Sequence, residues 1–100
     1  DVVSVCCFFL AHQPPNGLYN IGTGIARSFW DLVDNTFRAM DKKTAISFID
    51  TPEDIRATYQ YYTKADMQKL REAGYKDAFY SLEEGVKEYV QIFLKFSKYF

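Results

Sequence analysis

The chain alternates apolar segments with polar turns, and the first apolar segment predicts a helix. Residues 2–10 (VVSVCCFFL) are apolar nearly all round, as in a helix that is buried on several sides. The following HQPPNG, residues 12–17, joins two prolines to an Asn-Gly pair, which ends the helix and turns the chain. The short runs LYNI, residues 18–21, and TAISFID, residues 44–50, are typical of strands.

Three further helices are predicted by one start signature, a Ser or Thr followed three residues later by Asp or Glu. The pairs are Ser28 with Asp31, Thr63 with Asp66, and Ser81 with Glu84. The predicted helices run from Ser28 to about Asp41, from Thr63 to Gly74, and from Leu82 to about Phe100. The glycine at the end of the second helix suits a left-handed cap position.

Strands that alternate with helices predict the fold class. They favour parallel pairing through crossovers, so we expect an α/β fold with a few strands and about four helices. Two or three strands are too few for a stable doubly wound sheet, and the apolar run follows Asp1 with no lead-in. We therefore expect the chain to be a fragment of a longer protein.

Composition and charge narrow the classes of partner. The 100 residues are 48% hydrophobic and carry a net charge of −1, with the basic residues scattered along the chain. This distribution argues against nucleic acid or an anionic membrane as the main partner. The apolar run is too short to span a bilayer and lacks the features of a signal peptide.

The cysteines and the histidine are interpreted as structural residues. Cys6 and Cys7 are adjacent, so on a helix they point about 100° apart and cannot both reach one metal ion. We expect two buried core thiols, and the absence of a disulfide framework favours a reducing compartment. His12, the only histidine, lies at a turn with no assignable catalytic partner.

The glycine turn in YNIGTGIARS, residues 19–28, invites comparison with phosphate-binding loops. A dinucleotide fingerprint would need a third glycine at the position of Arg27, after Gly22 and Gly24. Ser28 and Asp31 are expected to satisfy the N–H groups of the helix that follows. We therefore interpret the turn as a structural strand-to-helix connection, without cofactor-binding residues.

Taken together, three segments resemble a known family. They are GLYNIGTGIARSFWDLVD, RATYQYYTKADMQKLREAGY and SLEEGVKEYV, and they resemble the C-terminal third of the extended short-chain dehydrogenase/reductase family of nucleotide-sugar enzymes. YNIGTG is common to the broad superfamily. The segment YQYYTKADMQKLREAGY narrows the resemblance to the ADP-L-glycero-D-manno-heptose 6-epimerases.

This resemblance implies an isomerase with an N-terminal NADP-binding Rossmann domain and a smaller substrate domain, to which residues 1–100 would belong. Such an epimerase converts ADP-D-glycero-D-manno-heptose into its L-glycero epimer by transient oxidation at C6 with bound NADP, in lipopolysaccharide biosynthesis. The resemblance places the catalytic and cofactor-binding residues before Asp1, so the chain alone would be inactive. It implies a cytoplasmic protein, homo-oligomeric when full-length.

One substrate contact is implied within the chain. In the family, the tyrosine before Gln helps to bind the nucleotide-sugar, and that residue is Tyr59 here. A phenol offers a hydroxyl for a diphosphate oxygen and a flat face for packing, although Tyr61 and Tyr62 compete for the role. Arg56 either binds phosphate through its forked donors or forms a surface ion pair with Glu53 or Asp54.

Two other interpretations stay open. The chain could be a stand-alone α/β module whose apolar first helix docks onto a protein partner. It could also be the same segment of another nucleotide-sugar epimerase or dehydratase, because the fold alone does not fix the substrate.

Overall fold

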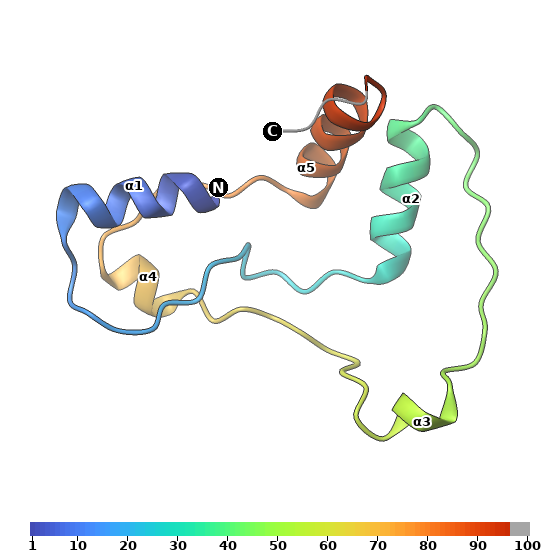
Figure 1. Cartoon of the computed structure of the whole chain (residues 1–100), viewed down its shortest axis with the longest axis horizontal. Helices are drawn as coiled ribbons and strands as arrows, with labels where there is room; N and C mark the ends of the chain where they lie inside the picture. Colours follow the sequence, from blue (N-terminus) through green and yellow to red (C-terminus); the bar gives the residue numbers. More distant parts are fainter. Residues whose placement is uncertain (97–100) are drawn as a thin grey trace. The chain divides into compact units, whose positions relative to one another are not determined.

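The computed structural model describes residues 1–96, which form five α-helices and one π-helix (Figure 1). The elements are α1 (Val2–His12), α2 (Phe29–Ala39), α3 (Glu53–Arg56), α4 (Gln68–Glu72), α5 (Leu82–Glu88) and the π-helix η1 (Tyr89–Leu94). The chain forms two compact units. The first unit comprises residues 1–26 and 64–81, and the second comprises residues 27–63 together with the segment that begins at Leu82.

The core of the first unit joins α1 to α4 and to the turn after α4. Val5, Leu70 and Tyr75 are almost completely buried, at 0%, 1% and 2% exposure. Partly buried side chains pack around them: Phe8, Phe9, Tyr19, Met67 and Phe79. Fully burying a side chain such as that of Val5 or Leu70 stabilises a fold by about 1.5–3 kcal/mol.

Polar contacts fix the segment before Gly22 to the start of α4. The Asn20 side-chain amide donates to the carbonyl of Asp66 at 3.1 Å. The Lys69 ammonium donates to the carbonyl of Leu18 at 2.9 Å and lies 4.6 Å from the centroid of the Tyr19 ring. This segment is therefore held in place by side chains.

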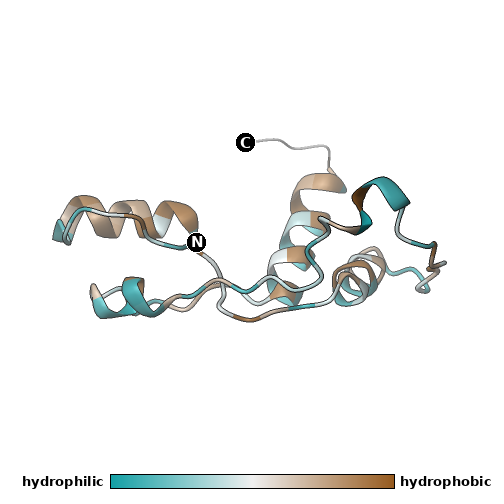
Figure 2. Ribbon diagram, turned by 90° about the horizontal axis from the view of Figure 1, so that it is seen from below, coloured by the Kyte–Doolittle hydropathy of each residue, from teal (hydrophilic) through white to brown (hydrophobic). Residues whose placement is uncertain are grey.

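The first helix is confirmed, but the prediction that it is buried on several sides is wrong. Val5 is its one fully buried residue, whereas Val3 and Leu10 are 74% and 79% exposed. Cys6 and Cys7 are exposed as well, which corrects the expectation of two core thiols. The physical reason is that α4 and the residues after it cover one side of the helix, while apolar residues continue around it (Figure 2).

The second unit packs α2 against α5 and η1. Ala39, the last residue of α2, and Val90 of η1 are its buried residues within the described part of the chain. The Gln91 side-chain amide donates to the Ala39 carbonyl at 3.3 Å, a group that has no partner inside the helix. The contact joins the two elements at that end.

The predicted helix starts have different outcomes. Ser28 and Asp31 form a complete capping box at α2, as predicted, and α5 begins at Leu82, directly after Ser81. The start at Thr63 is wrong, since α4 begins at Gln68 and the Asp66 carboxylate accepts from the Gln68 N–H at 2.9 Å.

Helix ends also differ in part from the prediction. Gly74 follows α4 with a φ of 103°, so the expected left-handed position is confirmed. The last predicted helix changes at Tyr89 from α-helical to π-helical hydrogen bonding. Its predicted end at Phe100 lies outside the described residues.

The predicted α/β class is wrong for residues 1–96, which contain no strand. Residues 18–21 and 44–50, the expected strands, are irregular segments that leave apolar side chains in solvent, with Leu18 92% and Phe48 81% exposed. A strand needs hydrogen bonds from a neighbouring strand, and neither segment has such a neighbour within this region. Within the same residues, no helix has the length and apolar character needed to cross a membrane.

Candidate functional site

The segment around α3 contains both residues that the sequence put forward as substrate contacts. Pro52 precedes α3, where its fixed φ suits the entry to a helix. After the helix, Thr58 turns back onto it: its backbone N–H and its hydroxyl both donate to the Ile55 carbonyl, at 3.1 and 3.3 Å. Tyr59 therefore starts from a fixed turn.

Arg56 is held by a backbone carbonyl. Its Nε and Nη2 atoms donate to the Thr51 oxygen at 3.3 and 2.8 Å. Neither of the alternative ion pairs, with Glu53 or Asp54, is present among residues 1–96. A guanidinium has five N–H donors, so this contact leaves others for an anion.

Tyr59 lies three residues after the end of α3 and is 38% exposed. Its ring meets that of Tyr61 in a T-shaped contact, with centroids 5.1 Å apart and planes inclined at 66°. Tyr61 and Tyr62 are more open, at 72% and 71% exposure. The structure thus places Arg56 and Tyr59 in one short segment of the second unit.

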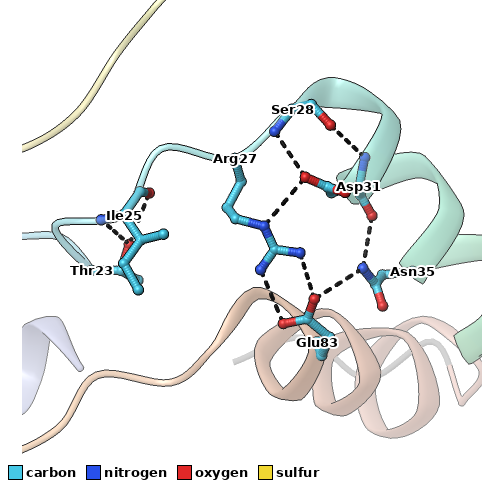
Figure 3. Close-up of polar contacts among 7 residues, drawn as sticks. All are labelled: Thr23, Ile25, Arg27, Ser28, Asp31, Asn35 and Glu83. Atoms are coloured by element: carbon cyan, nitrogen blue, oxygen red, sulfur yellow. Dashed lines mark hydrogen bonds and ion pairs between the residues drawn. The ribbon is translucent and has the colours of Figure 1, made fainter.

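A second polar cluster joins the start of α2 to α5 (Figure 3). The Arg27 guanidinium donates to both oxygens of Glu83, with Nη1 3.2 Å from Oε2, and its Nε donates to Asp31 at 3.3 Å. The Asn35 amide donates to the Asp31 carbonyl at 2.8 Å and lies 3.4 Å from Glu83. Because the Arg27 guanidinium already donates to two carboxylates, we interpret the cluster as a contact that stabilises the fold rather than a binding site.

The same contacts shift the ionisation of both acids. The hydrogen bonds from Arg27 lower the pKa of Glu83 to about 2. The pKa of Asp31 is lowered chiefly by the hydrogen bond from the Ser28 backbone N–H, then by the Ser28 hydroxyl and Arg27. The hydrogen bonds that Arg27 donates to Glu83, and then those to Asp31, raise the pKa of the guanidinium.

The Arg27–Glu83 pair was not predicted from the sequence. The spacing of four residues between Arg27 and Asp31 indicates a local pair at a helix start. No comparable pattern connects Arg27 with a residue 56 positions away.

The glycine turn packs closely against the segment before α4, although no strand precedes it among residues 1–96. A Cβ atom at Gly22 would lie 3.1 Å from that of Ala65, and one at Gly24 would lie 3.2 Å from Cγ of Met67. Gly24 also has a φ of 71°, which favours glycine. The two glycines therefore lie too close to the segment before α4 for a side chain to fit without a shift.

None of the known family models matches the sequence. The chain is 49% identical, over 94% of its length, to an ADP-L-glycero-D-manno-heptose-6-epimerase of Fusobacterium nucleatum. The chain is homologous to epimerases of this name. Proteins of the same name from Nitratidesulfovibrio vulgaris (strain DP4) and Brachyspira hyodysenteriae are 48% and 39% identical over 94% and 99% of the chain.

These matches confirm the resemblance to the ADP-L-glycero-D-manno-heptose-6-epimerases. The chain spans about 30% of the length of the curated relatives, with 30%, 29% and 31% covered in these three. The relatives are epimerases by name, and the chain aligns with part of each of them.

Proposed function

We propose that the chain is the C-terminal, substrate-binding segment of an NADP-dependent epimerase that inverts C6 of ADP-D-glycero-D-manno-heptose. The observation that carries this proposal is the 49% identity to an epimerase of that name across 94% of the chain. Similarity of this extent along nearly the whole chain favours a common substrate over another nucleotide-sugar.

In this proposal Tyr59 and Arg56 bind the diphosphate of the ADP-sugar. The Tyr59 hydroxyl makes no hydrogen bond to any of residues 1–96, and its ring is partly exposed, so a ligand oxygen can accept from it. Arg56 keeps donors beyond the two that Thr51 occupies, and its charge favours an anion. Both residues would bind and orient the substrate rather than react with it.

We assign cofactor binding and catalysis to other parts of a longer polypeptide. The glycine turn of this chain has Arg27 where a dinucleotide fingerprint needs its third glycine, so we assign the cofactor to an N-terminal Rossmann domain. We further propose that this domain covers apolar side chains left in solvent here, Val3 and Leu10 among them. The complete enzyme would be cytoplasmic and homo-oligomeric and would supply heptose for lipopolysaccharide, whereas the chain alone would be inactive.

The test is a proton NMR time course of the complete, NADP-loaded polypeptide acting on ADP-D-glycero-D-manno-heptose. The expected result is appearance of the L-glycero epimer. A folded, cofactor-loaded protein without turnover would overturn the substrate assignment, and the same assay with other nucleotide-sugars would then identify the substrate class.

A further inference from the structure

Hydrogen bonds lie on both sides of Tyr59 in the segment after α3. On the N-terminal side, the two hydrogen bonds from Thr58 to the Ile55 carbonyl close the turn. On the C-terminal side, the Thr63 hydroxyl donates to the Gln60 side-chain oxygen at 3.5 Å. The backbone is therefore restrained directly before Tyr59, by the Thr58 turn.

The side chain of Tyr59 is restrained separately, by Tyr61. A T-shaped contact at 5.1 Å sets the positive edge of one ring against the negative face of the other. The two residues are separated by one position in the sequence, Gln60. The contact limits the rotation of the Tyr59 ring and thereby the directions in which its hydroxyl points.

We propose that Tyr61 is a positioning residue that holds Tyr59 in the orientation required to bind the diphosphate of the ADP-sugar. The inference rests on the proposed function. Holding the ring before binding reduces the conformational entropy that the side chain loses when the substrate binds. Tyr61 acts through its ring and needs no contact with the substrate.

Tyr62 provides a matched control within the same segment. Its exposed fraction is 71%, against 72% for Tyr61, and it is the same type of residue one position further along. It makes no ring contact with any part of residues 1–96. Replacing either residue therefore removes a similar exposed surface, but only one replacement removes the contact with Tyr59.

The experiment compares Tyr61→Leu, Tyr61→Phe and Tyr62→Leu in the complete, NADP-loaded protein with ADP-D-glycero-D-manno-heptose. We expect Tyr61→Leu to raise KM roughly three- to ten-fold at unchanged kcat, a range typical of losing an aromatic pair. Tyr61→Phe keeps the ring and should restore the original KM. Tyr62→Leu should leave both constants unchanged.

A structural measurement tests the contact independently of turnover. In protein with 13C-labelled tyrosine, Tyr61→Leu should shift the Tyr59 ring signals by removing the neighbouring ring current, and Tyr62→Leu should not. Unmoved Tyr59 signals would overturn the inference, as would equal KM values for Tyr61→Leu and Tyr62→Leu.

Tyr59→Ala separates failure of this inference from failure of the substrate-binding role. If Tyr59→Ala raises KM while Tyr61→Leu does not, only the positioning role is overturned. If Tyr59→Ala leaves KM unchanged, the binding role of Tyr59 is overturned and the positioning role with it. If both variants raise KM, we expect the double variant, Tyr59→Ala with Tyr61→Leu, to have the same KM as Tyr59→Ala alone, because Tyr61 acts through the Tyr59 side chain.

Discussion

The guanidinium of Arg27 and the carboxylate of Glu83 face each other through two parallel hydrogen bonds, with Nη1 3.2 Å from Oε2. The two residues are 56 positions apart in the sequence, and Arg27 also pairs with Asp31 in the first turn of α2. The forked geometry joins the first turn of α5 to the start of α2. This contact connects the two helices at their N-terminal ends.

Glu83→Gln should reduce stability in a pH-dependent way. The folded pKa of about 2 lies below the ordinary value of 4.5, so the carboxylate contributes stability above pH 4.5 and loses it as the pH falls towards 2. Because the pair is solvent-exposed, we expect the melting temperature at pH 7 to fall by a few degrees at most.

The check is thermal unfolding followed by circular dichroism between pH 7 and pH 2. The gap between wild type and Glu83→Gln should close over the acidic part of this range. Glu88→Gln, on the same helix but outside the Arg27 cluster, is the control. A gap that stays constant down to pH 2 would contradict the ion pair.

Ser28→Ala should destabilise α2 by removing the side-chain half of its capping box. The Ser28 hydroxyl accepts from the Asp31 N–H at 3.0 Å, and loss of such a cap costs about 0.5–2 kcal/mol. Urea unfolding measures the change, and Ser28→Asn should recover most of it since Asn caps equally well. Equal stabilities of Ser28→Ala and Ser28→Asn would argue against the cap.

Substitution by alanine should change the folding stability in opposite directions at two glycines, one after α4 and one within α5. Gly74 has a φ of 103°, which disfavours a side chain, and we expect Gly74→Ala to cost about 1–2 kcal/mol. Gly85 lies within α5, and a methyl group added there would meet no neighbouring side chain within 4 Å, so Gly85→Ala should add about 0.5–1 kcal/mol. Chemical denaturation measures the free energy of unfolding of both variants. Changes of the same sign would be inconsistent with these backbone conformations.

Tyr59→Phe should weaken substrate binding in the complete enzyme. The change removes only the hydroxyl, which we assign to a diphosphate oxygen in ground state and transition state alike. KM should therefore rise more than kcat falls, by roughly ten-fold for one hydrogen bond to a charged group. Steady-state kinetics measure the split, and a loss confined to kcat would exclude this role.

Local patterns predicted local structure well. The capping box at Ser28, the helix end at Gly74 and the start of α5 all depend on contacts within a few residues, which the sequence displays directly. The Thr63 start failed because the same short pattern competes with other local hydrogen bonds, and here Asp66 accepts from Gln68 instead. Tyr59 was put forward from a family resemblance, and Arg56 from its forked donors a few residues before it; cap and turn patterns would have selected neither residue.

The sequence by itself determined where α1, α2 and α5 begin and that the chain resembles the ADP-heptose epimerases, because caps, turns and motifs are contiguous. Only the tertiary structure decided which side of α1 is covered, that Arg27 meets Glu83, and that Tyr61 packs on Tyr59. It also decided against strands at residues 18–21 and 44–50 within the described region. A strand and a buried helix face both require a partner surface. An apolar pattern indicates that a segment can be buried, but it does not identify the surface that covers it.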